Sequence, residues 1–233
     1  MIQVFFFLFV IVSALPVWSA EDVFIRQIGP NKNNCGITLP LKKTDKEAGL
    51  IVWFHGGMRS NLRNKGGRAH LAILPFTDSS CYVVSPSAFK GQDWLTSEGV
   101  ENIRSLVNYM LKRYRVNKQD INLVGVSDGC LAVIHYSMVA EHPINRRLLF
   151  SSFPGLVLQE GDLPAQKNFF QGSWYFFQGA KDRLFPSARV FPYLYFWKKT
   201  FPHTTLYLFP NGLHDFSFYA TNASDKIKQI LIK

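Results

Sequence analysis

The feature that most constrains the fold of this 233-residue chain is a serine between two glycines, in the run Gly125-Val126-Ser127-Asp128-Gly129. An apolar segment precedes this run and a helix-compatible segment follows it. A strand that turns directly into a helix places its central residue at strained backbone angles, and side chains two positions away would collide with the neighbouring elements. The glycines remove those side chains. The pattern therefore predicts that Ser127 is exposed at the carboxyl end of a buried strand and at the N-terminus of a helix.

The rest of the chain alternates short apolar runs with helical patterns. Segment 98–116 has apolar residues at the spacing i, i+3, i+4, i+7, which predicts a helix, and Phe216 to Leu231 is a second predicted helix. Such alternation is typical of βαβ units. It predicts an α/β fold with a mostly parallel central sheet of about six to eight strands and helices on both faces, in one domain over residues 20–233. The predicted strands are Leu50 to Phe54, Cys81 to Ser85, Ile121 to Val126, Leu148 to Phe153, Trp174 to Gln178 and Thr204 to Phe209.

A serine hydroxyl becomes a useful nucleophile only when a base removes its proton and a carboxylate orients that base. In a parallel sheet all strands end at the same edge, so the partners of Ser127 should follow strands. His214 follows the strand Thr204 to Phe209, whereas His203 precedes it and belongs at the opposite edge. His214 is therefore the predicted base.

The carboxylate should also follow a strand. Asp182 follows Trp174 to Gln178 and is the predicted acid, and Asp162, which follows the preceding strand, is the alternative. Asp128 and Asp215 adjoin the other members and are interpreted as a turn residue and a helix cap.

Acyl transfer passes through an oxyanion, which requires N–H donors fixed in advance. The strand Leu50 to Phe54 ends in His55-Gly56-Gly57-Met58, where glycines let the backbone approach a substrate carbonyl. The predicted donors are the backbone N–H groups of Gly57 and Asp128, with Met58 as the alternative for the first. His55 is expected to brace this loop.

Together these pieces resemble the α/β-hydrolase superfamily, and within it the small lidless serine esterases: feruloyl and acetylxylan esterases, polyhydroxybutyrate depolymerases and phospholipase/carboxylesterase-like proteins. The motifs FHGG, GVSDG, GAKDRLFP and GLHDF carry the resemblance, which spans nearly the whole chain after the N-terminal segment. It implies a triad of Ser127, Asp182 and His214, and ester hydrolysis without a metal or an organic cofactor. Only about thirty residues precede the first oxyanion strand after that segment, so shortened early antiparallel strands are expected.

The N-terminus predicts export. Residues 1–20 carry no ionisable side chain and contain an apolar run from Val4 to Val12, shorter than the roughly twenty residues that a membrane-spanning helix needs. We interpret residues 1–19 as a signal peptide and expect a secreted or periplasmic protein without stable membrane insertion after cleavage. The first five residues contain no Lys or Arg, which leaves an uncleaved anchor as the alternative.

The sequence contains Cys35, Cys81 and Cys130. In an exported protein this number permits one disulfide, and Cys35 with Cys81 is the candidate pair because Cys130 lies beside the serine motif, where a small buried residue is expected. Whether the bridge forms stays open. No group of cysteines and histidines has the spacing of a metal site.

The chain has 26 Lys and Arg against 16 Asp and Glu, a formal charge of +10, which favours anionic surroundings. These basic residues are dispersed, so no nucleic-acid partner is expected. Two clusters bear on the substrate. Arg59, Arg63, Lys65 and Arg68 either face an acidic substrate group or form a solvated surface, and the aromatic residues Phe191, Tyr193, Tyr195, Phe196 and Trp197 either line a pocket or belong to the core.

The resulting hypothesis is a secreted serine hydrolase that cleaves carboxylic esters, either small molecules or esters linked to a polysaccharide, through an acyl-enzyme. An acyltransferase, a thioesterase or a peptidase would use the same triad and is the first alternative. A non-catalytic binding module of the same fold is the second, although such a module has no physical need for all the catalytic pieces in order.

Overall fold

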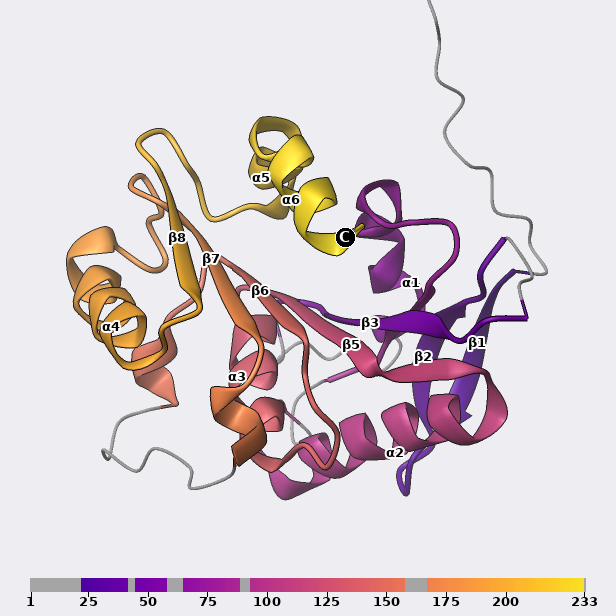
Figure 1. Cartoon of the computed structure of the whole chain (residues 1–233). Coiled ribbons are helices and arrows are strands. Elements are labelled where there is room, and N and C mark those ends of the chain that lie inside the picture. Colours follow the sequence, from indigo (N-terminus) through magenta and orange to yellow (C-terminus); the bar gives the residue numbers. More distant parts are fainter. Residues whose placement is uncertain (1–21, 42–44, 58–64, 89–92, 158–166, 233) are drawn as a thin grey trace, which may run out of the picture.

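The computed structural model describes residues 22–41, 45–57, 65–88, 93–157 and 167–232 (Figure 1). The predicted signal peptide, residues 1–19, lies outside the described residues, and so do Met58, Arg59, Arg63 and Asp162. No helix within the described ranges is both long enough and apolar enough to cross a lipid bilayer.

The described residues form an eight-stranded sheet in the order β1-β2-β4-β3-β5-β6-β7-β8. β1 pairs with β2 and β2 with β4 in antiparallel fashion, and all later pairs are parallel, which confirms the predicted mostly parallel sheet. The strands are β1 Val23–Ile28, β2 Asn33–Thr38, β3 Ala48–Phe54, β4 Tyr82–Ser85, β5 Val116–Val126, β6 Arg146–Phe150, β7 Ser173–Gly179 and β8 Thr204–Phe209.

Sequence reasoning did not predict β1 and β2 individually. β2 has the sequence NNCGIT, which contains no apolar run, although four of its six residues are buried in a row. Its place in the sheet comes from the ladder with β4, where Ile37 pairs with Val84. Neighbouring strands, and not local propensity, stabilise this segment.

Helices cover both faces of the sheet, as predicted (Figure 1). α2 (Ser97–Arg113), α3 (Gly129–Val139) and α4 (Ser187–Thr200) pack on one face, and α1 (Gly66–Ala69), α5 (Phe216–Asn222) and α6 (Ser224–Leu231) lie on the other. Along β3, Val52 and Phe54 face the first core whereas Ile51 and Trp53 face the second. This alternation is the two-residue period of a strand that is buried on both sides.

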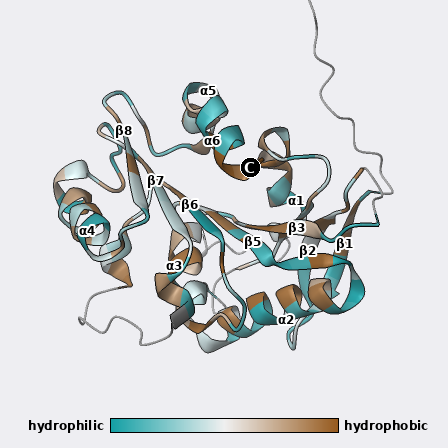
Figure 2. Ribbon diagram, viewed as in Figure 1, coloured by the Kyte–Doolittle hydropathy of each residue, from teal (hydrophilic) through white to brown (hydrophobic). Residues whose placement is uncertain are grey.

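The helix predicted over 98–116 is α2, which begins after Thr96, whose side chain accepts a hydrogen bond from the Gly99 N–H. It ends at Arg113, earlier than predicted, and Val116 already belongs to β5. Figure 2 shows hydrophobic and hydrophilic residues mixed along α2, and its apolar set is buried at Val100, Ile103, Leu106, Val107 and Met110. This spacing confirms the helical stripe and buries it against the sheet.

The prediction of one closing helix from Phe216 to Leu231 is wrong, because the structure divides this segment into α5 and α6 at Ala223, where φ is −131° and ψ is 15°. The buried residues Tyr219, Ala223 and Ile227 keep a four-residue spacing across the break, so the apolar pattern does not reveal it. Ser224 and Asp225, which follow the break, are residue types that favour the start of a helix.

The candidate disulfide is also absent, since Cys35 and Cys81 are both free thiols. The β2–β4 register pairs Gly36 with Ser85, which places Cys35 beside position 86, five residues beyond Cys81. Five residues of antiparallel strand span roughly 17 Å, whereas a disulfide requires Cα atoms within about 7 Å. The sheet register therefore excludes this pairing.

Candidate active site

The predicted strand-to-helix turn is present between β5 and α3. Ser127 lies between the two elements with φ of +54°, a left-handed conformation that costs a non-glycine residue about 1–3 kcal/mol. A Cβ on Gly125 would lie 2.5 Å from the Gly129 carbonyl oxygen, and one on Gly129 would lie 2.1 Å from that of Phe54. Both glycines are therefore required by close backbone approach, as the sequence pattern predicted.

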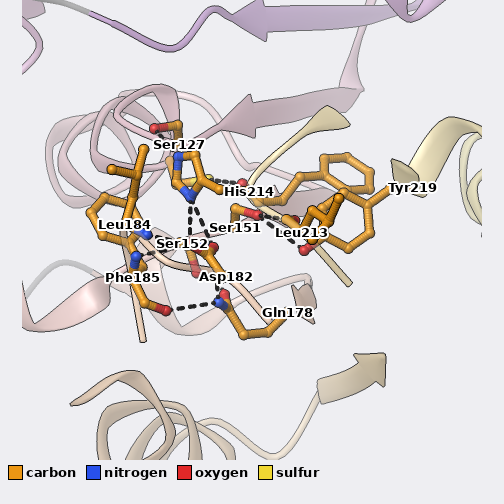
Figure 3. Close-up of polar contacts among 12 residues, drawn as sticks. Ser127, Ser151, Ser152, Gln178, Asp182, Leu184, Phe185, Leu213, His214 and Tyr219 are labelled. Atoms are coloured by element: carbon orange, nitrogen blue, oxygen red, sulfur yellow. Dashed lines mark hydrogen bonds and ion pairs between the residues drawn. The ribbon is translucent and has the colours of Figure 1, made fainter. Parts of the chain in front are cut away.

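The structure brings the three predicted catalytic side chains together (Figure 3). His214 Nε2 lies 2.7 Å from Ser127 Oγ, and His214 Nδ1 lies 2.9 and 2.8 Å from the two carboxylate oxygens of Asp182. An ionised carboxylate can only accept, so Nδ1 carries the proton and donates it to Asp182. Nε2 is then unprotonated and accepts from the Ser127 hydroxyl, which is the arrangement that general-base activation requires.

Asp182 sits in the loop between β7 and α4, with a fully buried side chain. Its Oδ1 accepts the backbone N–H groups of Leu184 at 3.0 Å and Phe185 at 2.8 Å. Burial by itself would raise the pKa of Asp182, but the hydrogen bonds from His214 and the Phe185 N–H outweigh it and lower the pKa below its usual value. Asp182 therefore stays ionised beside the imidazole. The alternative acid, Asp162, lies outside the described residues.

A buried amide that sequence reasoning missed braces this carboxylate. Gln178, at the end of β7, is 1% exposed, and its Nε2 donates to Asp182 Oδ2 at 3.3 Å. Its Oε1 accepts the Ser152 N–H at 3.1 Å, so Gln178 links the acid loop to the end of β6 (Figure 3). The sequence WYFFQG contains a signal for this role, because a polar residue ends an apolar strand at the edge of the sheet where Ser127 and His214 are predicted.

A second serine, Ser151, repeats the backbone geometry of the nucleophile one strand away. The predicted strand Leu148 to Phe153 ends at Phe150 because Ser151 has φ of +52°. The Ser151 N–H donates to the Phe177 carbonyl at 2.9 Å, just as the Ser127 N–H donates to the Phe150 carbonyl at 2.9 Å. Ser151 itself is fully buried, with its hydroxyl 3.0 Å from that of Tyr219 (Figure 3).

The predicted oxyanion loop lies beside the nucleophile. A Cβ built on Gly56 would lie 3.7 Å from Ser127 Oγ, and Gly57 has φ of +68°, which favours glycine. Among the described residues, the backbone N–H groups of Gly57 and Asp128 have no hydrogen-bond acceptor. Both amides are thus free to bind a substrate oxygen. Met58, the alternative donor, lies outside the described part of the chain.

His55 braces this loop, in agreement with the sequence interpretation. Its Nε2 accepts the Ala88 N–H at 3.0 Å, so its proton sits on Nδ1 and is donated to the Gly56 carbonyl at 2.9 Å. Burial lowers the pKa of His55 to about 4, so the ring stays neutral near pH 7. His55 therefore positions the glycine loop. His203, the histidine that precedes β8, lies at the opposite end of the strands from Ser127, as predicted, and its carbonyl accepts the Trp174 N–H.

The remaining predicted residues divide between structure and surface. Cys130 is fully buried beside the turn, and Asp215 caps α5 by accepting the Ser217 N–H. The aromatic segment is α4, in which Trp197 belongs to the core and Tyr195 is 55% exposed. Lys65 Nζ lies 3.5 Å from the Gly57 carbonyl oxygen, and Arg68 is exposed. The described residues include no group of three or more metal-ligating side chains.

No protein-family model and no curated protein matches the sequence. The fold matches solved structures, among them an S-formylglutathione hydrolase from Staphylococcus aureus, with a TM-score of 0.66 and 12% identity over 89% of this chain and 98% of that one. A thermostable esterase gives 0.63 and 14% over 81% of this chain, and an acylaminoacyl peptidase from Pyrococcus horikoshii gives 0.64 and 13% over 90%. This chain spans 55% of the esterase and 40% of the peptidase. Identities this low establish a shared fold alone.

Proposed function

We propose that this chain, whose fold is that of the α/β-hydrolases, is a serine hydrolase that cleaves carboxylic esters. The observation that supports this best is the continuous chain of hydrogen bonds from Ser127 Oγ through His214 to Asp182, beside the Gly57 and Asp128 amides, which have no acceptor among the described residues. Small esters or esters linked to a polysaccharide are the proposed substrates.

In the proposed reaction, His214 Nε2 removes the Ser127 proton as the oxygen attacks the ester carbonyl carbon. The carbonyl oxygen becomes an oxyanion that accepts the N–H groups of Gly57 and Asp128. When the intermediate collapses, His214 returns the proton to the leaving alcohol and an acyl-enzyme remains on Ser127. Water then attacks the acyl carbon with His214 again as base, which releases the carboxylic acid and restores the serine. Asp182 remains ionised throughout and stabilises the imidazolium.

Labelling by a fluorophosphonate tests this proposal. We expect mass spectrometry to find the label on the peptide that contains Ser127, and we expect Ser127→Ala to remove both labelling and hydrolysis of p-nitrophenyl acetate. Ser97→Ala, an exposed serine at the start of α2, is the matched control and should label fully. Folded wild-type protein that neither labels nor hydrolyses the ester would refute a serine hydrolase.

A second test concerns the acid. We expect Asp182→Ala to lower kcat by about two orders of magnitude or more, because the histidine then loses its orientation and tautomer. An unchanged kcat would instead favour Asp162. If added alcohols, thiols or amines took the acyl group faster than water did, the acyltransferase alternative would replace hydrolysis.

We further propose that residues 1–19 direct export and are then removed. The support is the uncharged apolar run at the N-terminus. Expression of the whole chain in a secreting host, followed by N-terminal sequencing of the exported protein, should find Ala20 as the first residue. A membrane-bound protein that retains residues 1–19 would favour the anchor.

A further inference from the structure

A hollow of about 810 Å³ adjoins the imidazole of His214. The loop after β7 contributes Lys181, Arg183 and Pro186 to its wall, and the loop after β8 contributes Leu213 and His214. Two loops from neighbouring strands thus form a surface that continues directly from the catalytic base.

The accessible charge of this hollow is positive. Lys181 and Arg183 are both exposed, and across the described ranges neither side chain forms an ion pair or a hydrogen bond. Asp182, the one carboxylate among the described wall residues, is 3% exposed and already accepts hydrogen bonds from His214, Leu184 and Phe185. Within the part of the chain that the structure describes, no carboxylate therefore pairs with either cation.

Because the hollow adjoins His214, we expect it to bind the alcohol portion of the ester. In the proposed reaction His214 gives its proton to the leaving alcohol, so the alcohol portion departs beside this ring. Leu213 is 50% exposed and Pro186 is exposed, so both offer apolar surface next to the cations. An apolar alcohol with an anionic substituent matches both properties of the wall.

We infer that the preferred substrates are esters whose alcohol portion carries a carboxylate or a phosphate, which Lys181 and Arg183 bind; this inference rests on the proposed function. The planar guanidinium of Arg183 can form two parallel hydrogen bonds with either anion, and the Lys181 ammonium adds a second charge. Lys65 is the alternative binding residue for an anion. It lies near Gly57 at the oxyanion loop, so it would bind an anion on another part of the substrate.

Three acetate esters test this inference: 4-acetoxybenzoate, 4-acetoxyphenyl phosphate and the neutral 4-acetoxybenzamide. The measured quantity is kcat/KM for each anionic ester divided by kcat/KM for the neutral ester. This ratio is compared between variants, so that differences in the intrinsic reactivity of the three esters cancel. We expect the ratio for at least one anion to fall about tenfold in Lys181→Ala/Arg183→Ala, an effect of the size of two exposed charge pairs. In wild-type protein the ratio should also fall with added salt.

Lys198→Ala is the matched control, because Lys198 is an exposed lysine twelve residues after Pro186 in α4, roughly 18 Å along the helix. This control should keep the wild-type ratio. The inference is overturned if the double variant also keeps that ratio, or if Lys65→Ala lowers it and the double variant does not. Wild-type protein that hydrolyses all three esters with no effect of charge refutes the inference and leaves the proposed hydrolase intact. Hydrolysis of none refutes the inference, and it refutes the hydrolase as well when the folded protein also fails to label with a fluorophosphonate.

Discussion

Replacing Gln178 by leucine tests whether its hydrogen bond to the Asp182 carboxylate contributes to catalysis. Leucine has a similar size but no amide, so it cannot donate to Asp182 and it leaves the Ser152 N–H without its acceptor. A hydrogen bond to a charged group contributes about 1.5–3 kcal/mol and an orphaned buried donor costs about 1–3 kcal/mol. The bond to Asp182 is long, at 3.3 Å, so the lower values apply, and we expect the free energy of unfolding to fall by about 2.5 kcal/mol.

The catalytic effect should be smaller than that of losing Asp182 itself, because the backbone N–H groups of Leu184 and Phe185 still hold the carboxylate. We expect kcat to fall about tenfold, or about 1.4 kcal/mol, with KM nearly unchanged. Urea unfolding, where the midpoint should drop by about 1 M, and p-nitrophenyl acetate kinetics measure the two effects. Gln229→Leu, on the exposed side of α6, is the matched control. A stable variant with wild-type kcat, or one with only a raised KM, would refute the positioning role.

The other predictions concern pH, the turn and a buried cation. Burial lowers the pKa of His70 to about 4, below the ordinary value of about 6.5 in the unfolded chain, so stability should be greatest above pH 6.5 and His70 should contribute about 3 kcal/mol to its loss as pH falls to 4. Urea unfolding at pH 7.5 and 4.5 should show a smaller loss for His70→Gln than for wild type, and an equal loss would contradict this assignment. Gly129→Ala places a Cβ 2.1 Å from the Phe54 carbonyl oxygen and should destabilise the protein by about 4 kcal/mol or more, so a melting temperature within a few degrees of wild type would contradict the close contact. Arg147 is fully buried and donates to four oxygen acceptors. Arg147→Met removes these hydrogen bonds and should lower the free energy of unfolding by about 3 kcal/mol; chemical denaturation that finds no loss would show that these bonds contribute nothing net.

The candidate active site could be predicted well from the sequence because local steric requirements determine its central turn. Glycine is required on both sides of Ser127, because a Cβ at Gly129 or Gly125 would lie 2.1 or 2.5 Å from a backbone carbonyl oxygen. The spacing of these two glycines therefore predicts the geometry of the turn. The strand order then places His214 at the same edge, since parallel strands end together. These inferences use local rules and one topological rule, and both transfer directly from sequence to structure.

What escaped prediction depends on contacts between segments far apart in the chain. β2 is a strand because β4 pairs with it, and its own residues do not predict one. Whether Cys35 and Cys81 can form a disulfide depends on the register of those two strands. Gln178 matters because Ser152 and Asp182 converge on its amide from two different loops. Tertiary partners supply this information, and no window of sequence contains it.

The paired left-handed serines provide an internal comparison for studies of reactivity. Ser127 and Ser151 have φ values of +54° and +52° and the same backbone hydrogen bond to the adjacent strand. Only Ser127 has an imidazole partner and partial access to solvent. An electrophile that modifies one residue and spares the other would therefore separate the influence of base and access from that of backbone torsion, within a single folded molecule and without any substitution.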